Sequence, residues 1–160
     1  MAGPHRAAGS GRKATGTVRR GRNAYYPAVQ QILAVGWFPE PEWALALQRW
    51  PALGDDLPAD HAAYRATIEQ RMPDIRTRTR GARLFMVSHT VADLDELAAI
   101  DGGDAGTAEL RGRVASLLAQ HGQGVLWPPA RNEPCWCASG LKYKRCCGVR
   151  RDRPAPSDAA

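Results

Sequence analysis

Residues 134–148 read PCWCASGLKYKRCCG and hold all four cysteines of this 160-residue chain. One residue separates the first two cysteines, and the last two are adjacent. Ser139-Gly140 predicts a turn between the pairs, and residues 141–145 can add one helical turn, so the two pairs should meet. Tetrahedral zinc needs four soft donors about 2.3 Å from one point. The stretch therefore predicts a zinc site, whose candidate ligands are Cys135, Cys137, Cys146 and Cys147.

Two other uses of these thiols are open at this stage. A disulfide inside either pair would be strained, because the separations do not suit its geometry. A disulfide between the pairs is sterically allowed but would close only a short loop. An iron–sulfur centre is the second alternative, since thiolates hold it as well. Zinc comes first because of ligand softness.

The longer stretch RNEPCWCASGLKYKRCCG, residues 131–148, resembles the SEC-C motif, the zinc knuckle at the C-terminus of the SecA translocase ATPase. The resemblance implies that the four cysteines ligate zinc. The chain departs from the family pattern at Glu133, Trp136, Ala138 and Leu141, which replace an aspartate, a proline, a glycine and a basic residue. Ala138 would cost about 1 kcal/mol if its position needs positive φ. Structural zinc contributes on the order of 10 kcal/mol, so the knuckle should still form.

The resemblance also suggests what the knuckle does. Two roles are open for Trp136, a partner contact or a lid against the rest of the protein. Zinc would fix a basic and aromatic contact surface for a protein partner of the secretory-chaperone kind or for the ribosome. No nucleotide motor is present, so translocase ATPase activity is not implied. The expected contact residues are Trp136, Lys142, Tyr143, Lys144 and Arg145.

Charge is unevenly distributed along the chain. Residues 1–24 carry a net charge of +6, residues 25–130 carry −4 and residues 131–160 carry +4. Nucleic-acid binding is therefore the alternative function, through the basic tail, an arginine strip at residues 76–80 and the knuckle. We expect a disordered tail at 1–22, a mostly helical domain at 23–124, a Pro-rich linker at 125–130, a knuckle at 131–149 and a disordered tail at 150–160.

The sequence pattern of the body, residues 23–124, predicts a mainly α fold with one or two short strands (α+β). The small C-terminal zinc knuckle follows it. Residues 83–88 are the best strand candidate. Thr90 with Asp93 predicts a capping box, and Thr107 a second N-cap. Residues 53–57 read as a loop and residues 76–80 as an exposed edge strand or loop. The expected helices cover residues 27–35, 41–50, 58–72, 91–100 and 108–121.

No enzymatic site is expected. His5, His61, His89 and His121 are not spaced as a metal pair. Ser88, His89 and Asp93 or Asp95 are too close in sequence to favour a hydrolytic set. A zinc with four thiolates has no open position, so its role would be structural, with no small-molecule substrate.

Compartment and membrane association follow from composition. Apolar runs fall short of the roughly 18 residues that span a bilayer, and no secretory signal is visible. Thiols in a zinc site favour a cytoplasmic location. The body also resembles actinobacterial SEC-C proteins, with an Arg-Trp-Pro helix end at residues 49–51 and Trp-Pro-Pro at residues 127–129.

Overall fold

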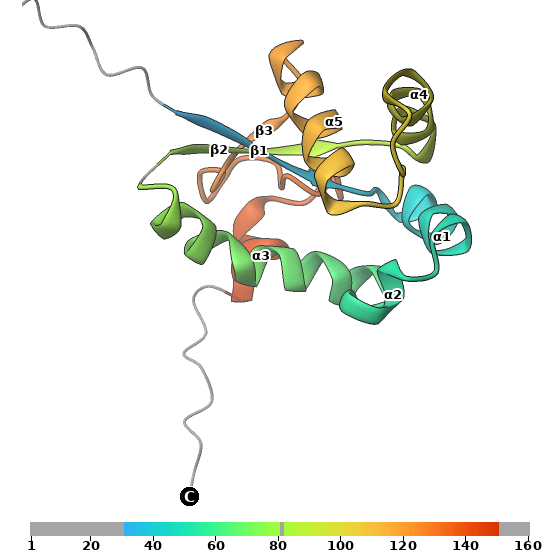
Figure 1. Cartoon of the computed structure of the whole chain (residues 1–160). Coiled ribbons are helices and arrows are strands. Elements are labelled where there is room, and N and C mark those ends of the chain that lie inside the picture. Colours follow the sequence, from blue (N-terminus) through green and yellow to red (C-terminus); the bar gives the residue numbers. More distant parts are fainter. Residues whose placement is uncertain (1–30, 81, 151–160) are drawn as a thin grey trace, which may run out of the picture.

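A three-stranded sheet lies at the centre of the computed structural model, which describes residues 31–80 and 82–150 (Figure 1). β1 (Ile32–Trp37) pairs in parallel with β2 (Arg83–Ser88), and β3 (Val125–Trp127) pairs antiparallel to β2. The expected fold class is confirmed, with three strands in place of one or two. Five α-helices and two short 3-10 helices complete the described chain: α1 (Glu40–Arg49), α2 (Leu53–Asp56), α3 (His61–Arg78), α4 (Val91–Asp101), α5 (Ala108–Gln120), η1 (Tyr143–Arg145) and η2 (Cys147–Arg150).

The first strand corrects the expected helix over residues 27–35. Residues 32–37 are β1, and residues 27–30 lie outside the described part of the chain. The apolar positions 29, 32 and 33 suggested a helical face, but Leu33, Val35 and Trp37 alternate along a strand instead. Pairing with β2 over all six residues fixes that strand, from Ile32 opposite Arg83 to Trp37 opposite Ser88.

The helix α3 is longer than expected. It begins at His61, where Asp60 caps the Ala63 amide, and it continues past Pro73 to Arg78. Pro73 removes one backbone hydrogen bond, yet Met72 and Ile75 pack on either side of it into the core. The edge strand or loop expected at residues 76–80 is therefore wrong, because this segment is mostly the end of α3. Its alternating arginines point in different directions around a helix and form no strip.

The helices α4 and α5 follow their local signals. Thr90 and Asp93 form the expected capping box of α4, and the Thr107 hydroxyl accepts from the Leu110 amide at the start of α5. Gly122 takes the left-handed conformation just after α5, with φ of 80°. Residues 53–56 form the one-turn helix α2 where a loop was expected.

The Pro-rich segment 125–130 is only partly a linker. Its first three residues form β3, with Leu126 opposite Phe85 in the sheet, and the Trp127–Pro128 peptide is cis. The first half of the segment between the expected domain and the knuckle is thus part of the sheet. Buried residues of the body and of the knuckle, Trp127 and Trp136 among them, belong to one hydrophobic cluster.

The sheet has two covered faces. On the first, called the helical face, Gly36 and Val87 lie beneath α5; a Cβ added to Gly36 would approach the Ala115 methyl to 3.3 Å. On the second, called the knuckle face, the Trp37 ring meets Trp136 edge-on with centroids 5.2 Å apart. Figure 1 shows α5 and α3 on opposite sides of the sheet, with the C-terminal segment running between the sheet and α3.

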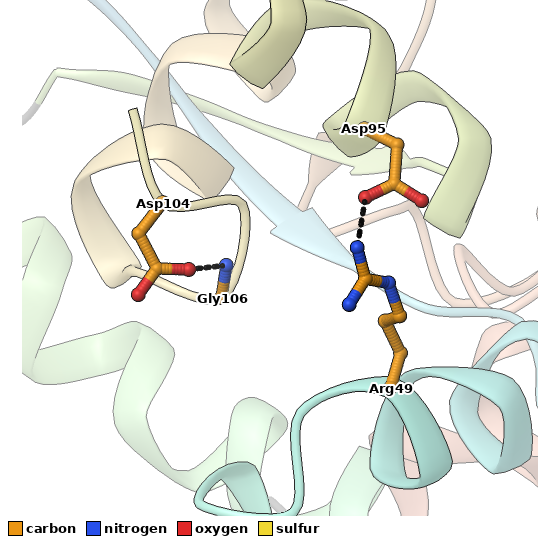
Figure 2. A network of polar contacts seen from close by, with 4 residues as sticks. All are labelled: Arg49, Asp95, Asp104 and Gly106. Atoms are coloured by element: carbon orange, nitrogen blue, oxygen red, sulfur yellow. Dashed lines mark hydrogen bonds and ion pairs between the residues drawn. The ribbon is translucent and has the colours of Figure 1, made fainter. Parts of the chain in front are cut away.

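Around the helical face, exposed polar contacts join α1 to α4 and order the turn before α5 (Figure 2). Arg49 lies 3.5 Å from Asp95, both well exposed, and the Gly106 amide donates to Asp104 at 2.9 Å. Exposed ion pairs contribute little, so packing carries most of the stability here. Within the described ranges, none of the helices combines the length and apolar character needed to cross a bilayer. Both expected disordered tails, apart from residue 150, lie outside these ranges.

Candidate metal centre

The knuckle is a small hairpin followed by two 3-10 turns. Pro134 pairs with Lys142, the Cys135 amide donates to the Leu141 carbonyl at 2.9 Å, and the Tyr143 amide donates to the Glu133 carbonyl at 2.8 Å. These bonds bring the second cysteine pair back to the first.

The tip of the hairpin needs left-handed backbone at Ala138 and Gly140, whose φ angles are 56° and 75°. Gly140 takes this conformation as expected. Ala138 bears the cost expected for a residue with a Cβ, about 1 kcal/mol. A glycine at position 138 would remove that cost.

The four cysteine sulfurs gather at one place. All lie within 4.8 Å of one another, and the Cys137 and Cys146 sulfurs are 3.4 Å apart. Four sulfurs about 2.3 Å from a central zinc stand about 3.8 Å from one another, so the cluster has the right size for a tetrahedral ion. Cys135 and Cys137 are buried, whereas Cys146 and Cys147 are partly exposed. The donor set fits a closed, structural metal site.

Hydrogen bonds among the cysteines shift their pKa values in opposite directions. Hydrogen bonds from Cys135 and Cys147 lower the pKa of Cys137 far below its ordinary value. The hydrogen bond to Cys137 raises the pKa of Cys135 to about 11, and hydrogen bonds to Cys135 and Cys137 likewise raise the pKa of Cys147. The sulfurs are thus close enough to share protons, and a divalent cation would replace those protons.

An arginine from the body contacts the cysteine cluster. The Arg65 Nη1 in α3 donates to the Cys137 sulfur at 3.0 Å and lies 3.9 Å from the Cys146 sulfur. Burial works to lower the pKa of Arg65, but the hydrogen bond to Cys137 and the nearby sulfur charges outweigh it and raise this pKa. A fixed positive charge therefore sits beside the cluster.

One turn further along α3, a buried carboxylate binds the rest of the knuckle. Glu69 is 2% exposed and accepts from the indole N–H of Trp136 at 2.7 Å and from that of Trp127 at 3.2 Å. The Tyr143 hydroxyl donates to it as well. A buried charge needs such donors, and three of them satisfy it here. Glu69 thereby joins α3, β3 and the knuckle.

The five expected contact residues divide into two groups. Trp136 and Tyr143 are 2% and 5% exposed, so the structure places Trp136 as a lid against the body and leaves neither ring on the surface. Lys142 and Arg145 are exposed, and Lys144 is half-buried beside a surface hollow that Pro128, Arg131 and Tyr143 also line. Leu141 and Val149, each 52% exposed, add apolar area to the outer side of the knuckle.

Sequence reasoning missed Arg65 and Glu69. Residues four apart on a helix, one basic and one acidic, read most simply as an exposed ion pair. Here each turns to the knuckle instead. Tyr64 and Ile68 form the apolar face of α3. Arg65 and Glu69 each follow one of these residues directly in the sequence, and this is the one signal that they could be partly buried.

His89, Asp93 and Asp95, the candidates for a hydrolytic set, each have a separate structural role. His89 is 1% exposed, its Nδ1 is 2.8 Å from the Trp37 carbonyl, and its ring stacks on Phe38. Asp93 binds Thr90 in the capping box, and Asp95 lies beside Arg49. Each of these acidic residues thus has a structural partner.

Comparison with known proteins bears on the knuckle. Two SecA proteins resemble short segments of the chain. "Protein translocase subunit SecA" of a Nitratiruptor species is 45% identical over 49 residues, which cover 26% of this chain and 6% of that protein. "Protein translocase subunit SecA" of Aliarcobacter butzleri is 84% identical over 19 residues, 12% of this chain and 2% of that protein.

The chain thus spans a very small share of the relatives it matches, and no solved structure matches it. Residues 131–148 match the family model described as "SEC-C motif", so the chain carries a SEC-C motif whose four cysteines form a cluster able to bind a metal ion.

Proposed function

We propose that this protein is a zinc-binding adapter whose SEC-C knuckle docks on a protein partner in the cytoplasm. The observation that carries the proposal is the convergence of four thiols, from two places in the sequence, within 4.8 Å. No catalytic role is assigned to the chain. We also propose that the chain resembles actinobacterial SEC-C proteins across much of residues 25–148, whereas the family model covers residues 131–148.

Zinc is the proposed metal. Four thiolates suit zinc or an iron–sulfur cluster, and the hairpin with a short turn suits a single ion. Elemental analysis of the protein purified without added metal should find one zinc per chain. Iron with a visible sulfur-to-iron absorption band would show that the cluster alternative is correct instead.

The docking surface is proposed to be the outer side of the knuckle. Lys142 and Arg145 supply exposed positive charge there, and Leu141 and Val149 supply exposed apolar area. SecA similarity favours a secretory chaperone or the ribosome as partner. Such partners present acidic or phosphate-rich surfaces, which the two cations complement.

Binding of the full chain to purified bacterial ribosomes and to a purified secretory chaperone tests the proposal. Lys142→Glu with Arg145→Glu should weaken binding at least tenfold, whereas Arg71→Glu, an exposed charge reversal on α3, should leave it unchanged. Equal binding by both variants, or full binding by metal-free protein, would contradict the proposal. Retention on RNA or DNA oligonucleotides, steeply weakened by salt, would favour the nucleic-acid alternative.

A further inference from the structure

The metal centre has a neighbour that lies outside the motif. Arg65 comes from the middle of α3, 72 residues before Cys137, yet its guanidinium reaches the Cys137 sulfur at 3.0 Å. Its Nε is buried and has no hydrogen-bond partner among the described residues. Ala62 and Ala66, on the same side of α3, leave a small hollow next to Cys146. The arginine is thus held against the cluster on the side where the sulfurs are partly exposed.

Electrostatics gives this contact a function. A divalent ion with four thiolates carries a formal charge of −2, and partial burial makes such a charge costly unless a cation balances it. A guanidinium keeps its charge at every physiological pH and donates several N–H groups in one plane. Lys142, Lys144 and Arg145 make no hydrogen bond to a sulfur within the described residues, although they lie in the motif itself.

A second contact fixes the approach of α3 to the cluster. Glu69, four residues after Arg65, accepts from Trp136, the residue between the first two cysteines. The Trp136 indole is also packed on Trp37 of β1. α3 therefore contacts the first cysteine pair twice, at the Trp136 side chain through Glu69 and at the Cys137 sulfur through Arg65. The body, not only the motif, determines where these sulfurs lie.

We propose that Arg65, although it does not ligate the metal, belongs to the metal centre and raises its affinity by balancing the charge of the thiolates. The inference rests on the proposed function in one respect, that the four thiols bind a metal. It adds that the knuckle of this chain is not self-sufficient. Partners of metal ligands outside the coordination sphere typically contribute a factor of about 10–100 in metal affinity.

Metal titration of the full chain tests the proposal. The reduced, metal-free protein would be titrated with Co²⁺, whose thiolate bands report the coordination, and with Zn²⁺ in competition with a coloured chelator. Arg65→Met should weaken metal binding about 10–100-fold. The matched control Arg71→Met, which removes an exposed charge from the same helix, should bind as the unchanged protein does.

A conservative variant separates charge from packing. Arg65→Lys keeps the charge and should recover most of the affinity and the Co²⁺ spectrum, whereas Arg65→Met should shift the sulfur-to-cobalt band. Wild-type affinity in Arg65→Met, or Arg65→Lys no better than Arg65→Met, would overturn the proposal. If circular dichroism shows that Arg65→Met is unfolded, Arg65→Gln replaces it under the same criterion. Failure of the unchanged protein to bind either metal would instead refute the proposed function.

Discussion

The two faces of the sheet are closed by different chemistry. The helical face is covered by α5, through apolar side chains such as Val114 and Ala115, with α4 and Leu94 packed beside it. The knuckle face is covered by Trp136 and Tyr143, whose side chains, like that of Trp127 in β3, donate hydrogen bonds to Glu69 in α3. Apolar burial closes the helical face, whereas the knuckle face adds directed hydrogen bonds and a cysteine cluster to its apolar contacts.

The difference teaches how the motif and the body depend on each other. Burial on the helical face needs only the helices that the sequence itself encodes by their caps and apolar stripes. On the knuckle face, the lid residue Trp136 lies between two cysteines, so its position follows from the geometry of the cluster. We expect metal loss to disturb the knuckle face and to leave the helical face largely intact.

Metal removal should have the largest effect. Structural zinc contributes on the order of 10 kcal/mol to a small metal-bound unit. When a chelator removes the metal, Trp136 and Tyr143 should therefore leave their sites under α3. Hydrogen exchange followed by mass spectrometry should show faster exchange in α3 and β3. Peptides of α5 serve as the internal control. Equal loss of protection in α5 and α3 would erase the distinction between the faces.

Removing the buried carboxylate should have the next largest effect. Glu69→Leu leaves three buried donors without an acceptor and should lower the free energy of unfolding by about 3–5 kcal/mol. Glu69→Gln keeps one acceptor oxygen and should lower it by less. Urea denaturation measures both. The loss should shrink in chelated protein, because the donors are then already exposed; an unchanged loss would show that Glu69 acts independently of the cluster.

A substitution that creates a cavity on the helical face tests the comparison from the other side. Leu94 is fully buried in α4, and Leu94→Ala should cost about 3 kcal/mol through lost burial and the cavity left behind. The variant should bind metal normally, in contrast to Arg65→Met. Denaturation with and without chelator should give the same cost. A cost that depends on metal would mean that the two faces are coupled through the sheet.

Acid should weaken the helical face through His89. Burial lowers the pKa of His89 from 6.5; the Trp37 carbonyl, Asp93 and Glu42 oppose this, and Arg111 supports it. The neutral ring is therefore favoured in the folded state, so its contribution is complete above about pH 6.5 and is lost as the pH falls below that value, by at most about 1.4 kcal/mol per pH unit. Urea denaturation between about pH 5 and 7, a range that brackets the pKa of histidine in the unfolded state, should show a flatter slope for His89→Gln. A slope that survives the substitution would come from other groups.

Local signals in the sequence predicted much of the helical face and little of the knuckle face. Thr90, Thr107 and Gly122 mark helix ends by bonds to their own neighbours, so the sequence suffices to place them. The strand β1 depends on pairing with β2, some fifty residues away, and was expected as a helix. The cysteine spacing predicted the cluster, whereas the roles of Arg65 and Glu69 required tertiary contacts that no local pattern carries.

The carboxylate at the centre of the knuckle face also has a consequence for synthesis. Its three donors follow it by 58, 67 and 74 residues. A chain emerging from the ribosome would therefore hold an uncovered, solvated Glu69 until almost the whole described sequence had been translated. Closure of that side therefore has to wait for the knuckle, and it would take place when the thiols first compete for a cellular metal ion.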